Sequence, residues 1–512
     1  MKKHNIFKIL TIVILVSIVL SYFIPGTTMG YGSVEKGTIL PVTFANTFTN
    51  SITSFSAFIT LFIYILVIGV FYAVLKKTDR YETLVDNTAS VFDKNKGLFV
   101  VITVFALGLS TLFTGELYSM LIFIPFLISV LKKLGFNKYT SILATVGSTI
   151  LGFSGTLYTM YANQFLSLTV KDNLTVKITL ALIGLVSIVA FILVFNKKPV
   201  DKGEVRRSTK KKMLPIYITF ILMFVLLILG FVNWEAYFGF TGFNDFLTQL
   251  RDAKVAGVSI FDAIIGNTVV AFGNWQPYNA ATLFTFVTVL IALIYRVKIN
   301  DIFESFIEGL ENAFPYAMIM VLANIVLVNI YSSGVFYTLI VGITEKTINV
   351  FNTSVSGILA SLFFPDYAYA SQFTLSGIVN TTATDYQNLF AVGFQAIYAL
   401  FLLISPTSII LLFALRKEEI TYGEWIKYII KYFLVLLFID VLVIAIFMKG
   451  FNGTTAIFLA AIIVLYAFII VTTKKKIDKK EDKKVEVKVE KKEDKKVSKP
   501  ATKKTTKKVT KK

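Results

Sequence analysis

The feature that most constrains this chain is a series of long apolar runs. A helix needs about 20 apolar residues to cross the hydrocarbon core of a bilayer. Runs without a charged side chain cover residues 55–75, 213–232 and 455–472, and further ones cover residues 9–24, 98–113, 178–195, 280–295 and 317–344. Soluble cores do not repeat such lengths. The sequence therefore predicts an all-α, polytopic membrane protein.

The distribution of Lys and Arg predicts how these helices are oriented, because short loops rich in both stay in the cytoplasm. Three lysines precede the first run, eight basic residues lie between positions 197 and 212, and the chain ends in a lysine-rich tail. Both termini are therefore expected in the cytoplasm, with the protein crossing the cell membrane an even number of times. We expect roughly ten to twelve transmembrane helices, with shorter segments that do not cross.

The domain organisation follows from the same pattern. Residues 1–473 are predicted to form the transmembrane domain, in two halves of about 1–212 and 213–473. The tail, 474–512, contributes +12 of the formal net charge of +20 and lacks aromatic residues, so it is predicted to be a disordered cytoplasmic segment. It fixes the topology or is attracted to anionic membrane lipids. Because the rest of the chain carries little net charge, no nucleic-acid partner is predicted.

The sequence lacks the motifs of enzymes. There is no Cys, the single His is His4, and no phosphate-binding loop of the Gly-x-x-x-x-Gly-Lys-Ser/Thr type is present. We therefore predict no catalytic residue, no metal and no cofactor beyond a coupling Na⁺ or H⁺. This favours a secondary transporter over an enzyme. The alternative is a non-transport membrane protein, either a membrane-embedded enzyme or a structural or assembly factor.

Small and polar residues interrupt the apolar pattern in three places, at residues 147–156, 372–384 and 405–408. Non-helical backbone at membrane depth is tolerated where it is buried in protein or lines a cavity, and broken helices bind substrates in transporters. The alternatives are close helix packing, a wet loop and a proline kink, respectively. The predicted substrate-binding residues are Ser148, Thr149, Ser154, Thr156, Ser376, Asn380, Thr381, Thr407 and Ser408.

Two acidic residues lie within or between apolar runs. Glu116 follows Thr114-Gly115, and Asp440 lies inside the run 432–447. An ionisable group inside a membrane is costly and is a candidate functional residue. Glu116 is therefore the predicted ion-coupling residue, with a hairpin tip in water as the alternative. For Asp440, a packed, paired or interfacial position is favoured.

A series of short motifs follows in a characteristic order over residues 9–447. The motifs are Ile68–Phe71, Thr114–Glu116 before a Phe-Ile-Pro sequence, Gly147–Gly152, Glu308–Ala323, Pro406–Ser408 and Ile420–Lys427. Together they resemble the YfcC-like and four-carbon dicarboxylate carrier group of the ion transporter superfamily.

This resemblance implies two halves with re-entrant hairpins, a substrate site between the hairpin tips, and an elevator-type movement in a homodimer. It implies a small carboxylate-bearing substrate: an amino acid, a dicarboxylate or a short-chain fatty acid. The sequence departs from the family where an Asn-Pro element is replaced by Thr156–Thr159, and where the usual Ala-Arg is Ala323-Asn324. Loss of that Arg puts the family's carboxylate-binding site, and with it the substrate class, in doubt.

Overall fold

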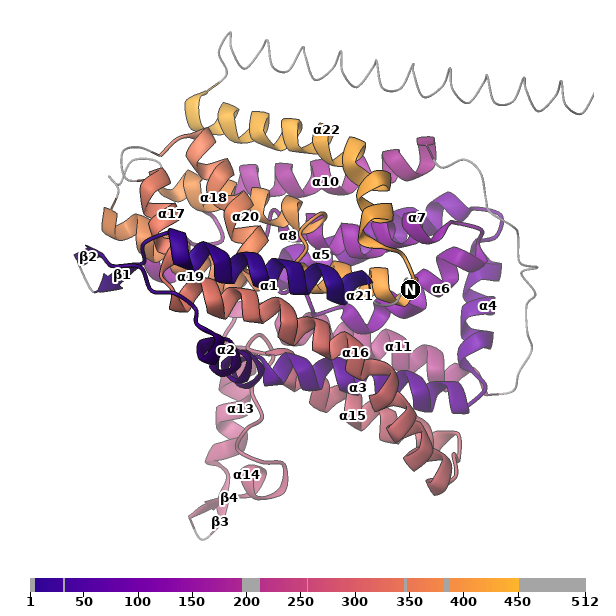
Figure 1. Ribbon diagram of the computed structural model, residues 1–512. Helices are drawn as coiled ribbons and strands as arrows, with labels where there is room; N and C mark the ends of the chain where they lie inside the picture. Colours follow the sequence, from indigo (N-terminus) through magenta and orange to yellow (C-terminus); the bar gives the residue numbers. More distant parts are fainter. Residues whose placement is uncertain are drawn as a thin grey trace, which may run out of the picture. The chain divides into compact units, whose positions relative to one another are not determined.

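The computed structural model describes residues 5–30, 33–195, 212–255, 257–344, 348–381 and 387–450. This part of the chain is predominantly helical (Figure 1). The predicted run 455–472, the tail 474–512 and all but the last residue of the basic loop 197–212 lie outside the described residues. Their predicted roles therefore stay predictions.

Eight helices of the described part are long and apolar enough to cross a membrane. They are α1 (Asn5–Phe23), α3 (Ile59–Lys77), α5 (Lys96–Thr114), α10 (Leu174–Phe195), α11 (Leu214–Phe231), α15 (Pro277–Ile294), α16 (Ile299–Ser332) and α22 (Tyr422–Lys449). Shorter apolar helices are α17 (Val335–Thr344), α18 (Val350–Phe363) and α20 (Gln387–Leu402). The all-α membrane architecture is confirmed, while a total of ten to twelve crossings stays a prediction.

Shorter elements connect these helices. They are α2 (Phe44–Ala57), α4 (Tyr81–Phe92), η2 (Leu121–Phe123), α6 (Ile124–Lys133), α7 (Lys138–Ile142), the π-helical η3 (Leu143–Gly147), α8 (Ser148–Phe153), α9 (Met160–Leu166), α12 (Trp234–Phe238), α13 (Gly242–Asp252), α14 (Ile260–Ile264), α19 (Tyr367–Thr381) and α21 (Ile409–Lys417). Two short antiparallel ribbons pair β1 (Thr27–Gly30) with β2 (Ser33–Lys36) and β3 (Lys254–Val255) with β4 (Val258–Ser259).

Two predicted runs are divided in the structure. The run 55–75 contains the end of α2 and the start of α3, which meet at Phe58. The run 317–344 contains the end of α16 and all of α17, because Gly334 adopts a left-handed conformation with φ +66° between them. A hydrophobicity pattern does not predict such a turn, because the residues on both sides of it are apolar.

The core contains helix crossings that depend on glycine. At Gly69 of α3, an added Cβ would lie 2.6 Å from the carbonyl oxygen of Gly309 in α16, so only glycine permits this approach. A second close approach joins α5 and α8 at Gly108 and Gly152. Small residues allow this kind of backbone packing inside membranes. These crossings bring α5 and α8 together near the candidate site described below.

Basic residues gather where α3, α6 and α21 end. Lys132 of α6 forms an ion pair with Glu418 at 2.8 Å, and Lys417 Nζ lies 5.6 Å from the ring centroid of Tyr72 in α3. Arg416 lies over the ring of Phe7 near the start of α1. These basic helix ends therefore lie close to the N-terminal end of α1, which is the grouping that the positive-inside rule predicts for one membrane face.

Candidate functional site

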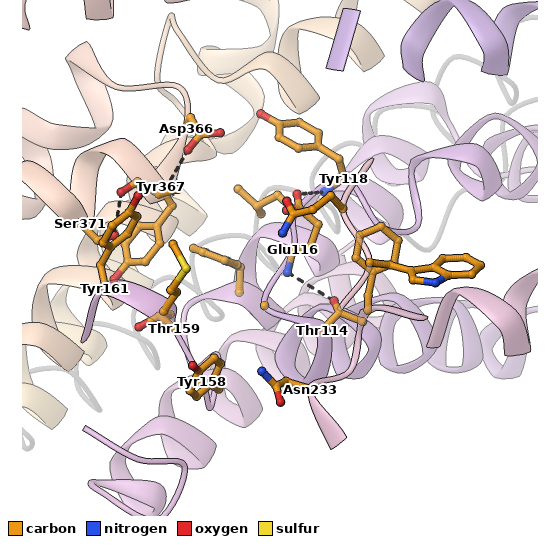
Figure 2. Close-up of a pocket in the computed structure, with 18 of the residues that line it drawn as sticks. Thr114, Glu116, Tyr118, Tyr158, Thr159, Tyr161, Asn233, Asp366, Tyr367 and Ser371 are labelled. Atoms are coloured by element: carbon orange, nitrogen blue, oxygen red, sulfur yellow. Dashed lines mark hydrogen bonds between the residues drawn. The ribbon is translucent and has the colours of Figure 1, made fainter. Parts of the chain in front are cut away.

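A cavity of about 370 Å³ lies where segments from both halves of the chain meet (Figure 2). The end of α5, the turn after α8, the end of α11 and the loop between α18 and α19 all contribute to it. Its polar lining residues are Thr114, Glu116, Tyr118, Tyr158, Thr159, Tyr161, Asn233, Asn274, Gln276, Asp366, Tyr367 and Ser371. Two of these are carboxylates, and the lining includes no Lys or Arg.

Glu116 enters the cavity because α5 ends just before it. Gly115 takes a left-handed conformation with φ +66° and terminates the helix. The Glu116 Oε1 atom then accepts a hydrogen bond from the Tyr118 backbone N–H at 3.1 Å, and the Thr114 hydroxyl accepts one from the Glu116 N–H at 3.4 Å. The second carboxylate oxygen has no hydrogen bond with another described residue. Glu116 thus lies beside a cavity, as expected for the functional residue that the sequence predicts. Its role in ion coupling stays a prediction.

Asp366 is the second carboxylate of the cavity. It follows Pro365 in the loop between α18 and α19, and its Oδ1 accepts hydrogen bonds from the N–H groups of Ala368 at 2.8 Å and Tyr369 at 3.3 Å. Both carboxylates thus bind the backbone N–H two residues further on. Asp366 was not among the residues predicted from the sequence, although an acidic residue just after the apolar helix α18 is the same signal that singled out Glu116.

Burial favours the protonated form of both carboxylates, and the charge of Asp366 adds to this effect at Glu116. Both lie outside the eight candidate spans. Burial raises the pKa of Glu116 to about 7; the Tyr118 N–H lowers it, and the negative charge of Asp366 raises it further. Burial also raises the pKa of Asp366, against the effect of the Tyr369 and Ala368 N–H groups. With no basic residue in its lining, the cavity favours protons or other cations beside these two groups.

A hydrogen-bond network ties the cavity to the first predicted break. The Gln395 side chain of α20 donates from Nε2 to the carbonyl oxygens of Phe153 at 2.9 Å and Thr156 at 3.3 Å. Its Oε1 accepts from the Tyr367 hydroxyl at 3.3 Å. The Phe153 carbonyl also accepts from the Thr156 N–H at 3.1 Å, so Gln395 is its second donor. Gln395 thus links the end of α8 to Tyr367, whose ring lies beside Phe153 at a centroid distance of 5.0 Å.

The first predicted break occurs where expected, because α8 ends at Phe153. Its four predicted binding hydroxyls are buried and do not line the cavity. Ser148 and Thr149 donate to carbonyl oxygens one turn earlier, and Ser154 donates to Leu151 at 2.6 Å. Thr156 donates to the carbonyl of Thr111 in α5 at 3.4 Å. In this conformation these hydroxyls bind the protein's own backbone.

The predicted break at residues 405–408 also occurs where expected. Residues 403–408 separate α20 from α21, with Pro406 among them. The Thr407 hydroxyl donates to the Ser361 carbonyl of α18 at 3.0 Å, and Ser405 donates to the same oxygen at 2.6 Å. The Ser408 hydroxyl is buried and has no hydrogen-bond partner among the described residues. This break therefore packs against α18, away from the cavity lining.

The predicted break at residues 372–384 is wrong in its position over the described residues 372–381. Helix α19 continues without interruption through Gln372 and ends at Thr381, because polar residues alone do not break a helix. The interruption lies earlier, at the loop that carries Asp366. Ser376 is half-buried and bonds to the Phe373 carbonyl at 3.2 Å. Asn380 and Thr381 are described by their backbone alone, and residues 382–384 lie outside the described residues.

Asn324, which stands where the resembled family usually has Arg, lies in α16. Asn324 is fully buried there, and its Nδ2 donates to the Met320 carbonyl one turn earlier at 3.1 Å. Its Oδ1 has no partner among the described residues. Asn324 is not part of the cavity lining.

Comparisons with known proteins place the chain in context. The family model of the C4-dicarboxylate anaerobic carriers (DcuC) matches residues 4–377. The YdaH transporter of Alcanivorax borkumensis is similar in structure, with 13% identity, a TM-score of 0.38, and coverage of 87% of this chain and 97% of YdaH. MtrF of Neisseria gonorrhoeae, from a class of antimetabolite efflux pumps, gives 14% identity, a TM-score of 0.40, and coverage of 88% and 96%. No curated protein matches the sequence significantly.

Proposed function

Because the chain belongs to the C4-dicarboxylate anaerobic carrier family, which confirms the resemblance of its motifs, we propose that it moves a small carboxylate-bearing solute across the cytoplasmic membrane. The solute is an amino acid, a dicarboxylate or a short-chain fatty acid. Its movement is coupled to a sodium or proton gradient, or to exchange. The family consists of carriers, so the chain is a transporter and not an enzyme.

The observation that carries this proposal is the pairing of Glu116 and Asp366 in one cavity whose lining contains no Lys or Arg. An anionic solute is repelled by two ionised carboxylates in a poorly solvated space. It binds there only when protons or metal cations have neutralised them. Binding of the solute therefore requires binding of the cation, and this dependence is the basis of coupled transport.

The charges in the cavity lining favour some of the proposed substrate classes over others. The amino group of an amino acid can pair with Glu116 or Asp366, while its carboxylate faces the amide side chains of Asn233, Asn274 or Gln276. A dicarboxylate lacks a cationic group and needs more co-transported cations. We therefore place amino acids first and dicarboxylates second, although the family is described by the latter.

The proposed movement is of the elevator type, with the two breaks as parts of re-entrant hairpins. In support, α8 ends at Phe153, and α18 and α19 are too short to cross a membrane comfortably. The predicted hydroxyls of Ser148, Thr149, Ser154, Thr156, Thr407 and Ser408 would contact solute only after such a movement, because they now bind the protein's own groups or lie buried. A homodimer, the boundary at residue 473 and cytoplasmic termini complete the proposal.

The test is uptake by proteoliposomes of labelled glutamate, fumarate and butyrate, with sodium and proton gradients imposed separately. Gradient-dependent accumulation of one of them is the expected result. The double variant Thr407→Ala/Ser408→Ala tests the hydroxyl site, with Asp252→Asn on the exposed surface of α13 as the matched control. Absence of accumulation under every gradient and for every solute would contradict the proposed substrate class. Full uptake by the double variant would show that the hydroxyls of Thr407 and Ser408 are not part of the solute site.

A further inference from the structure

A second group of buried polar atoms lies away from the cavity, between α18 and α22. Asp440 of α22 is 3% exposed, and Thr353 and Ser356 of α18 are 0% exposed. The Asp440 Oδ1, Thr353 Oγ1 and Ser356 Oγ atoms have no hydrogen-bond partner among the described residues. Buried polar atoms are nearly always paired, so an unpaired set of this kind indicates a missing ligand.

The helix register places these three residues around α20. Gly393 of α20 is the common contact: a Cβ added there would lie 2.7 Å from Thr353 Cγ2 and 3.2 Å from Ile444 Cγ2. Asp440 lies one helical turn before Ile444 on the same face of α22. Thr353 is therefore level with Gly393 along α20, and Asp440 lies about one helical turn away from that level.

A second pair of contacts fixes the directions of the helices. Gly357 of α18 packs on Ile397, one turn after Gly393, so α18 runs parallel to α20. The rings of Phe401 and Phe433 meet at 4.9 Å, so α22 runs antiparallel to α20. Asp440 is thus level with Ile397, as is Ser356, the residue before Gly357. Helix α18 also contacts α22 directly.

The hydroxyls of Thr353 and Ser356 differ from others in the same helix. Ser354 donates to the Val350 carbonyl at 2.8 Å, and Ser361 donates to the Ile358 carbonyl at 2.7 Å. Such back-bonding is the usual way for a buried helical hydroxyl to be satisfied. Thr353 and Ser356 do not use it, and their oxygen atoms have no hydrogen-bond partner among the described residues.

The chemistry of the three groups indicates the ligand. A buried carboxylate without a partner is strongly unfavourable, and no described Lys or Arg forms an ion pair with Asp440. Carboxylate and hydroxyl oxygens are hard ligands that suit hard metal cations, and a single carboxylate balances a single positive charge. Divalent ions usually take several carboxylates. We propose that Asp440, Ser356 and Thr353 form a binding site for a sodium ion.

The role of this sodium site in transport rests on the proposed carrier function: a sodium gradient would act on α22 and α18 at this site. Sodium binding itself does not depend on any solute. The test therefore measures binding of radioactive sodium to the purified full-length chain in detergent, with choline replacing sodium at constant ionic strength. Thermal unfolding over the same sodium series gives a second readout.

The expected result is saturable binding and a midpoint of unfolding that rises with sodium. Asp440→Asn should abolish both effects and still fold, because a neutral amide removes a buried charge. Ser356→Ala should weaken sodium affinity by about tenfold or more. Asp252→Asn, on the exposed surface of α13, should match the wild type in both readouts.

Two outcomes would overturn the proposal: no saturable sodium binding by the wild type, or unchanged binding by Asp440→Asn. Failure of the carrier function is distinguishable from both. If Asp440 is required for sodium binding but proteoliposomes accumulate no solute, the site stands and the proposed transport fails. If solute accumulates but Asp440→Asn leaves sodium binding unchanged, transport stands and the site fails.

Discussion

Replacing Glu116 with Gln should remove a pH-dependent penalty on stability. Burial raises the pKa of Glu116 from its ordinary 4.5 to about 7. The folded protein therefore binds this proton more tightly than the unfolded chain does. Below about pH 4.5 the group is neutral in both states and carries no penalty. As the pH rises toward 7, ionisation favours the unfolded chain, so stability is lost.

The size of this penalty follows from the same values. A rise in pKa from 4.5 to about 7 corresponds to an upper limit of about 3 kcal/mol at pH values above both. Glu116 keeps part of its surface open to the cavity, and water there reduces the penalty. We expect about 1–2 kcal/mol, or about 1–3 °C in the midpoint of unfolding.

The assay is thermal unfolding of the purified protein in detergent from about pH 4.5 to about pH 8, for the wild type, Glu116→Gln and the control Asp252→Asn. The difference between Glu116→Gln and the wild type should grow in favour of the variant across this range and level off above about pH 8. Asp252→Asn should show no such growth. A difference that stays constant with pH would refute the assignment of Glu116 as a buried acid that holds its proton near neutrality.

Substitutions at three further positions test the packing of the two helix breaks, each by the midpoint of thermal unfolding. Gly152→Ala puts a methyl group against the backbone of Gly108 and should cost about 1–3 kcal/mol; an unchanged midpoint would contradict the close crossing of α5 and α8. Gln395→Ala removes a donor from the Phe153 carbonyl and leaves the Thr156 carbonyl unpaired, and it should cost about 1–3 kcal/mol, whereas a neutral effect would mean that water replaces the amide. Thr407→Ala should cost about 1 kcal/mol and Thr407→Ser much less, because serine keeps the hydroxyl bond to Ser361; equal losses would assign the effect to the methyl group.

Much of the helical architecture could be predicted from the sequence. The runs 98–113, 178–195 and 213–232 correspond to α5, α10 and α11, because charge-free length is the physical requirement for crossing a bilayer. The breaks after Phe153 and around Pro406 were also predictable, since glycine and proline act locally on the backbone. Of the interruption expected at residues 372–384, the described part, 372–381, is helical, because the hydroxyl and amide side chains of α19 are compatible with a continuous helix.

The candidate site could be predicted only in part. Glu116 was identifiable because an acidic residue between apolar runs needs an explanation. Asp366 lies in the same cavity, but its proximity to Glu116 results from the packing of two segments that are far apart in the sequence, which local sequence patterns do not encode. Nor does the sequence show whether a hydroxyl such as that of Ser148 bonds to its own helix or stays free, as that of Ser356 does, because both depend on the side-chain rotamer.

The central claim is that the cavity with Glu116 and Asp366 couples a cation to solute movement. The most direct test is the initial rate of solute uptake by proteoliposomes with and without an imposed cation gradient, comparing the wild type with Glu116→Gln/Asp366→Asn. The labelled glutamate or fumarate that the wild type accumulates serves as the probe. We predict gradient-driven accumulation by the wild type, and only passive equilibration by a variant that is equally folded. Gradient-driven accumulation of the same extent by the double variant would contradict the account.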